Sequence, residues 1–525
     1  MDKETKFLYG VDHLTAGKAL AIARSELKAY LPSSAVEKIK KSYDIVQDIA
    51  KGDKAVYGIN TGFGPLCNTQ ISVDDTSTLQ YNILKSHSVG VGDDIPNEIA
   101  KLMLILKVHS LAQGYSGISI STLERIIWLI DHNVIPKVPC QGSVGASGDL
   151  APLAHLFLPL IGLGKVDYKG QTLIAKEFHQ KENLESIKLE AKEGLALING
   201  TQFITAFAVK VVEKLHSCLS QADLVASIII EGLLGSSSPF FDELHALRPY
   251  PGNKHVAHRI KTLLSESEIL NSHVDCDRVQ DPYSLRCIPQ IHGTSRTAWL
   301  HLKELLEIEL NSVTDNPIII HRELSISGGN FHGQPLALPL DYATLAASEI
   351  GNVSDRRIYL SLMGMAKGVP KLLMKDAGIN SAFMMLQYTS AALASENKSL
   401  CFPASADSIP TSLGQEDHVS MGSIAGRKAL QVLGNLEKIL AIELICAVQS
   451  FDYQLPLKSS PIINKLHAFV RSKIDHAEED RVFADDINKA IEIIQSKALL
   501  DVVNELNKEN SFHLRSEFEE LFEKY

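Results

Sequence analysis

The chain has 525 residues, of which 45% are hydrophobic and 22% are charged, a composition typical of a soluble globular protein with a large buried core. Its formal net charge is −11 and it contains no block of basic residues, which argues against nucleic acid as an electrostatic partner. No uninterrupted apolar run reaches the ~20 residues that a membrane-spanning helix needs, so we expect no membrane association.

The seven cysteines are scattered, and none forms a Cys-x-x-Cys pair. They indicate neither a zinc ribbon nor a disulfide framework, and free thiols are typical of a reducing compartment. The first residues contain no apolar segment of a secretory signal, so we expect a cytoplasmic protein. The 19 histidines include no His-Glu-x-x-His motif and no complete ligand set, and we therefore expect no catalytic metal.

Apolar periodicity predicts helices in the first part of the chain. Residues 34–50 form one, with Ser34 and Glu37 as a capping box, and residues 99–135 are helical with a break at 114–117. Tyr57 begins a glycine-rich loop, and His87 lies at the end of a helical segment within 79–92. On pattern alone, Tyr57 and His87 are ordinary surface or polar residues.

Residues 142–150 form the most informative stretch, with glycines at 142, 145 and 148 and a proline at 152. They predict a crowded loop that leads into a buried helix. The loop lacks the Gly-x-Gly pair of a dinucleotide fingerprint and the Gly-x-Ser-x-Gly frame of a hydrolase. The triplet Ala146-Ser147-Gly148 permits another chemistry. If the Gly148 amide attacks the Ala146 carbonyl with loss of one water, and Ser147 loses a second, the backbone becomes a methylidene-imidazolone electrophile.

The remainder of the chain predicts two domains in a mainly α fold: an N-terminal domain over 1–202 and a long helical bundle over 203–525. Residues 165–173 suggest a short hairpin, and 317–320 with 324–326 suggest another. Residues 194–202 place Asn199 in an apolar segment, where a buried amide must find hydrogen-bond partners. Long apolar-periodic segments predict the bundle helices at 203–233, 297–311, 340–363, 424–449 and 485–508.

Three loops between these helices carry further candidate site residues. Residues 280–287 contain Gln280, Tyr283 and Arg286, and the planar fork of an arginine suits a bidentate grip on a carboxylate. Residues 328–333 contain Phe331, for which ordinary packing is the alternative. Residues 408–418 contain Glu416.

Residues 142–155, Gly-Ser-Val-Gly-Ala-Ser-Gly-Asp-Leu-Ala-Pro-Leu-Ala-His, resemble the cofactor-forming loop of the aromatic amino acid ammonia-lyases. That family includes histidine, phenylalanine and tyrosine lyases and aminomutases, and motif matches run from about Tyr57 to Gly422. The resemblance implies that Ala146, Ser147 and Gly148 cyclise autocatalytically to 4-methylidene-imidazol-5-one, without a metal or nucleotide. It also implies a fumarase/aspartase-like bundle and a homotetramer whose active sites combine loops from several subunits.

The resemblance also assigns roles to the candidate residues. Tyr57 removes the β-proton of the substrate, which requires a site that stabilises phenolate, because an unperturbed tyrosine has a pKa of about 10. Arg286 binds the α-carboxylate, and Asn199 and Tyr283 position the substrate and its adduct. The residues that line the substrate pocket are His87, Gln280, Phe331 and Glu416.

The segment Gln415-Glu416-Asp417-His418 looks like the histidine-lyase version of its loop. An imidazole offers N–H donors to a carboxylate, whereas a phenyl or phenol ring would leave that carboxylate without a partner. With His87, this implies non-oxidative deamination of L-histidine to trans-urocanate and ammonia, the first step of histidine degradation. Residues 413–414 and 80–82 depart from the histidine-lyase pattern, so a tyrosine ammonia-lyase or aminomutase stays the alternative.

Two hypotheses belong to other classes of protein. A serine hydrolase that uses Ser147 predicts labelling of that residue by a fluorophosphonate. A non-catalytic helical scaffold predicts an intact Ser147, and a peptide mass across 142–155 that shows the loss of two waters would exclude it.

Overall fold

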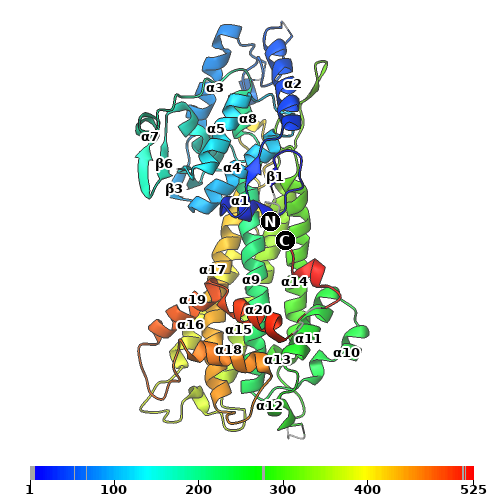
Figure 1. Ribbon diagram of the computed structural model, residues 1–525, viewed down its shortest axis with the longest axis vertical. Coiled ribbons are helices and arrows are strands. Elements are labelled where there is room, and N and C mark those ends of the chain that lie inside the picture. Colours follow the sequence, from blue (N-terminus) through cyan, green and yellow to red (C-terminus); the bar gives the residue numbers. More distant parts are fainter. Residues whose placement is uncertain (1–5, 53, 67, 275–277, 511–513, 515) are drawn as a thin grey trace.

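The computed structural model describes residues 6–525 except 53, 67, 275–277, 511–513 and 515. The described chain forms two lobes connected by long helices, with the N-terminal elements in the upper lobe of Figure 1 and the C-terminal helices in the lower one. Helices dominate both lobes, which confirms the predicted mainly α class. The boundary at residue 202 stays a prediction, because the long helices extend through both lobes.

The helices of the upper lobe pack around α4, whose residues 99–111 are all buried. A helix that is buried on all sides lies in the interior of its lobe. The upper-lobe helices are α1 (Ala16–Ala23), α2 (Ser33–Ala50), α3 (Val73–His87), α4 (Asn97–Leu111), α5 (Ile120–Asp131), α6 (Leu150–Phe157), α7 (Ala175–Lys181) and α8 (Glu193–Ile198).

Helix α2 matches the helix predicted over 34–50, but the predicted capping box is wrong. Pro32 is the N-cap residue, and no side chain caps the first turn. The helix therefore begins one residue before Ser34, because the fixed φ of a proline already prepares the chain for a helical turn.

Short strands complete this lobe and the tip of the bundle. Strands β6 and β7 pair as the hairpin predicted over 165–173, with β4 added at the β6 edge, and β8 and β9 form the second predicted hairpin. The strand bounds are β1 (Phe7–Leu8), β2 (Ala29–Tyr30), β3 (Val91–Asp94), β4 (Ile135–Pro136), β5 (Pro139–Gln141), β6 (Lys165–Tyr168), β7 (Gln171–Ile174), β8 (Ile318–His321) and β9 (Leu324–Ile326). Strands β1 to β5 were not predicted, because two to four residues are too few to show alternation.

Helix α17 lies at the centre of the bundle and packs along both α9 and α15. A Cβ added at Gly426 of α17 would lie 2.9 Å from the Phe207 Cβ of α9, so a glycine lets these two helices approach closely. The bundle helices are α9 (Gln202–Gly232), α14 (Ile288–Leu310), α15 (Gln334–Leu362), α16 (Met384–Leu400) and α17 (Gly422–Asp452).

The smaller helices of the lower lobe cover the bundle. The helix predicted over 485–508 is wrong as one element, because Lys497 has a left-handed φ of 63° and separates α19 from α20. The covering helices are α10 (Asp242–Ala246), α11 (Pro251–Leu263), α12 (Glu268–Asn271), α13 (Tyr283–Arg286), α18 (Pro461–Arg471), α19 (Phe483–Gln495), α20 (Ala498–Asn510) and α21 (Glu519–Phe522).

Buried charges connect several of these helices. Asp223 of α9 accepts hydrogen bonds from Arg296 at 2.5 Å and His292 at 2.8 Å, both on α14, and from Arg259 of α11 at 3.2 Å. Burial opposes ionisation of Asp223, but the Arg296 charge and the His292 hydrogen bond hold its pKa well below the usual range. A buried carboxylate needs such partners, so Asp223 fixes the relative positions of three helices.

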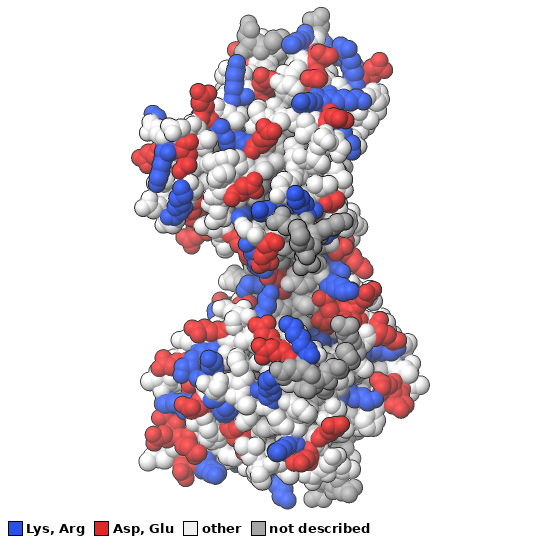
Figure 2. Space-filling view, in the orientation of Figure 1, with Lys and Arg blue, Asp and Glu red and all other residues white. Residues whose placement is uncertain are grey.

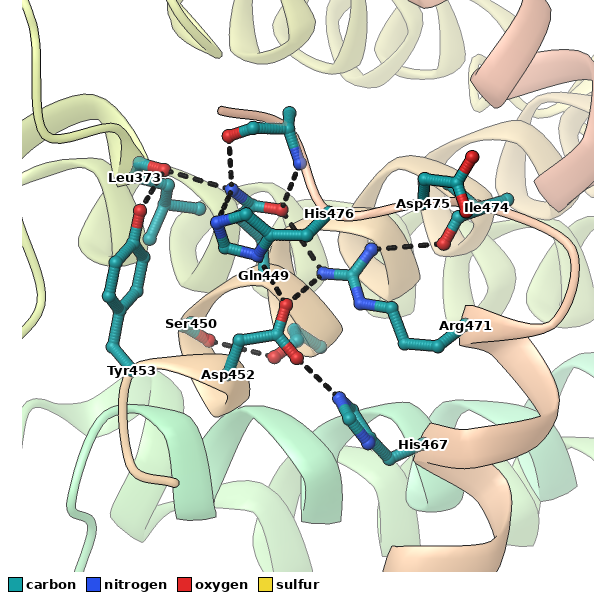
Figure 3. A network of polar contacts seen from close by, with 12 residues as sticks. Leu373, Gln449, Ser450, Asp452, Tyr453, His467, Arg471, Ile474, Asp475 and His476 are labelled. Carbon is teal, nitrogen blue, oxygen red and sulfur yellow. Dashed lines mark hydrogen bonds and ion pairs between the residues drawn. The ribbon is translucent and has the colours of Figure 1, made fainter. Parts of the chain in front are cut away.

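A second polar cluster lies at the end of α17 (Figure 3). Asp452 accepts hydrogen bonds from His467 at 2.6 Å, His476 at 2.5 Å and Arg471 at 2.6 Å. Burial acts against the charged form, but these partners lower the pKa of Asp452. Gln449 contacts Arg471 on the same side and completes the attachment of α18 to the bundle.

The surface carries charges of both signs. On the face shown in Figure 2, lysines and arginines are interspersed with aspartates and glutamates over both lobes. Among the helices that the structure describes, none combines the length and apolarity needed to cross a bilayer.

Candidate active site

The loop of residues 142–148 connects β5 to α6 and is compressed against the turn at Asn199 and Gly200. Gly148 has a φ of +79°, and a Cβ at this position would lie 2.1 Å from the Gly200 carbonyl oxygen. The Asp149 amide donates to that same oxygen at 2.8 Å. Glycine at position 148 is therefore required by both its dihedral and its surroundings.

The other side of the loop contacts a segment nearly 280 residues later in the chain. The Met421 amide donates to the Val144 carbonyl at 2.9 Å, and the hydroxyls of Ser420 and Ser423 donate to the carbonyls of Gly145 and Ser143 at 3.2 and 2.6 Å. These two serines were not predicted as site residues, because nothing in their local pattern indicates a contact with a segment so distant in the chain.

Asp149 holds the loop to the start of α9. Its carboxylate accepts from the Ile204 amide at 2.9 Å and from the Ser143 hydroxyl at 3.0 Å. Full burial raises the pKa of Asp149 to about 7, against the lowering effect of these hydrogen bonds. A carboxylate at a helix N-terminus also interacts favourably with the helix dipole.

Ser147 lies between Glu416 and Asn199. Its hydroxyl donates to the Glu416 Oε1 at 2.6 Å, and the Asn199 Nδ2 donates to its carbonyl at 3.2 Å. The Asn199 Oδ1 is buried and has no hydrogen-bond partner among the described residues. A buried amide oxygen without a partner is costly in a native protein and marks a place where a ligand group can donate.

Two hydroxyls fix the orientation of the Glu416 carboxylate. Thr411 and Ser412 each donate to its Oε2 at 2.8 Å, and the Thr411 amide donates to the Glu416 carbonyl at 2.9 Å. These two residues lie in the predicted 408–418 loop, but their role was missed because hydroxyl groups are common in any loop.

A cavity of about 440 Å³ opens above Ser147, large enough for an amino acid. Tyr57, His87, Ser147, Asn199 and Glu416 line it, together with apolar side chains such as Leu79, Ile83 and Leu195. Five of the predicted site residues, from five separate segments, are therefore brought together.

His87 ends α3 with its ring half-buried, and its Nδ1 lies 3.0 Å from the Ser86 hydroxyl. Burial lowers the pKa of His87, against a hydrogen bond to the Ile83 carbonyl and the nearby Glu416 charge. Tyr57 stands at the other side, where the Gly64 amide donates to its hydroxyl oxygen at 3.5 Å.

The other predicted residues do not line this cavity. Gln280 and Arg286 line a different cavity, of about 700 Å³, near α13 in the lower lobe. Tyr283 is 68% exposed there, with the Arg286 guanidinium 4.7 Å from its ring centre. Phe331 is half-buried just before α15. A single chain thus does not assemble the whole predicted site.

The family model described as aromatic amino acid lyase matches residues 14–472. The chain belongs to this family. Membership confirms the resemblance drawn from residues 142–155, and the hydroxyl of Ser147 bonds to a carboxylate rather than to the imidazole that a serine hydrolase needs. In the described part of the chain, no three metal-ligating side chains group together.

Individual members of this lyase family are similar over nearly the whole chain. The histidine ammonia-lyase of Myxococcus xanthus is 43% identical, with 95% of this chain and 98% of that protein covered, and that of Natranaerobius thermophilus is 45% identical, with 91% and 94% covered. The crystal structure of histidine ammonia-lyase from Trypanosoma cruzi has a TM-score of 0.88 at 36% identity and covers 99% of this chain and 98% of that one. Tyrosine aminomutase from Streptomyces globisporus has a TM-score of 0.91 at 32% identity, with 97% and 100% covered.

Proposed function

We propose that this protein is a histidine ammonia-lyase, which converts L-histidine to trans-urocanate and ammonia. The observation that carries the choice of substrate is the Glu416 carboxylate, oriented by two hydroxyls and placed beside Ser147 in the cavity. A substrate imidazole offers this carboxylate an N–H donor, and a phenol or phenyl ring in the same position does not. The lyases of similar sequence named above support the same substrate.

The proposal includes the methylidene-imidazolone prosthetic group, formed from Ala146, Ser147 and Gly148. The surroundings fit it: position 148 accepts no side chain, Ala146 is buried, and the Asn199 amide already donates to the Ser147 carbonyl, which becomes the carbonyl of the ring. When formed, the group supplies an electrophilic methylidene for the substrate's amine. We also place the enzyme in the cytoplasm, where the described free thiols persist, and cell fractionation tests this.

The remaining chemistry belongs to side chains of this protein. Tyr57 takes the β-proton of the substrate, because it lines the same cavity as Ser147, and its hydroxyl oxygen accepts from the Gly64 amide at 3.5 Å. Asn199 withdraws electron density from the Ser147 carbonyl through its hydrogen bond. His87 and Glu416 hold the imidazole ring of the substrate.

We assign Gln280, Tyr283, Arg286 and Phe331 to the same site through a homotetramer, in which other subunits supply them. Arg286 binds the α-carboxylate of the substrate, and its Nε is buried without a hydrogen-bond partner among the described residues. An apolar stripe on α15 supports association. Its members are 43–56% exposed, and their spacing places them on one helix face: Leu338, Tyr342, Leu345 and Tyr359.

Mixed oligomers test this assignment. Coexpression of Arg286→Ala with Ser147→Ala is expected to restore turnover well above that of either variant alone, because some sites then combine intact residues from both chains. The control for Arg286→Ala is Arg248→Ala, which also removes an arginine that stacks on a tyrosine, but an exposed one. We expect Arg248→Ala to have normal turnover by itself. Mixtures as inactive as the separate variants, or a monomer in sedimentation velocity, would contradict the composite site.

The substrate is tested by incubating the purified protein separately with L-histidine, L-tyrosine and L-phenylalanine and following the ultraviolet absorbance of the conjugated products. We expect urocanate as the main product. Coumarate in its place, or β-tyrosine detected by chromatography, would establish a tyrosine lyase or aminomutase and overturn the role of Glu416 in substrate choice.

A further inference from the structure

Lys107 is a fully buried lysine on α4, with 1% of its surface exposed. Its Nζ donates to the carbonyl oxygens of Ala196 at 2.9 Å and Asn199 at 2.5 Å. Lysine is rarely buried unless its amine is paired, so a lysine with no exposed side in a buried helix needs a specific reason.

The two carbonyls that Lys107 contacts lie at the end of α8. The last carbonyls of a helix have no partners within it, and the last turn of α8 carries no basic residue of its own. The amine of Lys107 therefore supplies the cap of α8 from another helix, where the negative end of the helix dipole also favours a cation.

The residues fixed by this cap face the cofactor-forming loop. Asn199 donates to the Ser147 carbonyl at 3.2 Å, and Gly200 packs against Gly148 and accepts from the Asp149 amide at 2.8 Å. The Lys107 amine is therefore separated from the Ser147 carbonyl by a single residue, Asn199.

We propose that Lys107 is a positioning residue for the reaction, which holds Asn199 and Gly200 against Ala146-Ser147-Gly148 so that the loop cyclises and Asn199 stays aimed at the Ser147 carbonyl. The inference rests on the proposed function. Nothing in the family motif at residues 142–155 points to position 107, which lies on a different element.

The charges around Lys107 are consistent with this role. Burial lowers the pKa of Lys107 to about 7, Asp315 and Asp149 act in the opposite direction, and Lys192 adds to the lowering. A neutral amine still has two N–H donors, enough for both carbonyls. Lys192 is occupied elsewhere, since it donates to the Ser116 carbonyl at 3.0 Å and pairs with Asp315 at 2.5 Å.

The test compares Lys107→Met with Lys101→Met. Lys101 lies on the same helix, is 4% exposed, and donates to the Asn133 side chain at 3.1 Å, away from the cavity. For both proteins we would measure the mass of the peptide across 142–155, the melting temperature, and kcat and KM with L-histidine. The peptide mass shows the fraction of loop that has lost two waters, independently of turnover.

We expect both variants to lose thermal stability, but only Lys107→Met to show a reduced cyclised fraction or a kcat lowered by roughly 10- to 100-fold. Equal cyclisation and equal kcat in the two variants would overturn the positioning role and leave a structural one. If Lys107→Met does not fold, Lys107→Gln is compared with Lys101→Gln by the same criteria. If the wild-type protein is cyclised but inactive on L-histidine, the proposed substrate fails while the peptide mass still decides the role of Lys107.

Discussion

The variant Ser147→Ala is expected to lower turnover of L-histidine by at least about 10³-fold and to leave the fold intact. Alanine has no hydroxyl to eliminate, so the electrophile cannot form, and enzymes of this kind owe accelerations of roughly 10⁶ or more to their active sites. Only one hydrogen bond, that from Ser147 to the Glu416 carboxylate, is lost from the described structure, which costs about 1.5–3 kcal/mol of stability. The measurements are kcat, circular dichroism and the peptide mass across 142–155.

The control for this variant is Ser227→Ala. Ser227 is fully buried in α9 and donates to the Asp223 carbonyl at 2.9 Å, so its replacement also removes a hydrogen-bonded hydroxyl, but far from the cavity. We expect Ser227→Ala to keep the loss of two waters and near-normal turnover. Near-normal turnover in Ser147→Ala, or an uncyclised loop in an active wild-type protein, would contradict the cofactor assignment.

The variant Glu416→Gln is expected to lower kcat/KM for L-histidine by at least about 10²-fold and to change that for L-tyrosine much less. A site built to accept a hydrogen bond from its substrate loses discrimination by such factors when that contact is removed. The neutral amide keeps the size of the carboxylate and can still contact Thr411 and Ser412, so the loop should hold its shape. Steady-state kinetics with both amino acids measure the difference.

Asp417→Asn provides the matched control for charge. It removes one negative charge from the next residue, whose side chain is exposed and does not line the cavity. We expect its effect on the two substrates to be small and equal. If Glu416→Gln also affects both substrates equally, Glu416 does not select the imidazole ring. The proposed substrate choice then fails, but the proposed methylidene-imidazolone group is unaffected.

Much of the helical architecture could be predicted from apolar periodicity. The positions of α9 and α17 follow from long runs whose buried residues recur at helical spacing, and the predicted ends lie within a few residues of the observed ones. Local signals were less reliable at boundaries. Periodicity continued across Lys497 because α19 and α20 both bury apolar faces, so one helix was predicted where the left-handed residue makes two.

By itself, the sequence determined the family and the mainly helical class, and it predicted the chemistry of residues 142–148, which depends on residue types in a contiguous motif. Only the tertiary structure decided which distant residues meet that motif. Ser147 contacts Glu416 across 269 positions, and Lys107 reaches Asn199 across 92. Periodicity reports that a side chain is buried but not which neighbour it meets, and that depends on how the helices pack. For the same reason, the tertiary structure alone separated Gln280, Tyr283 and Arg286 from the cavity of their own chain.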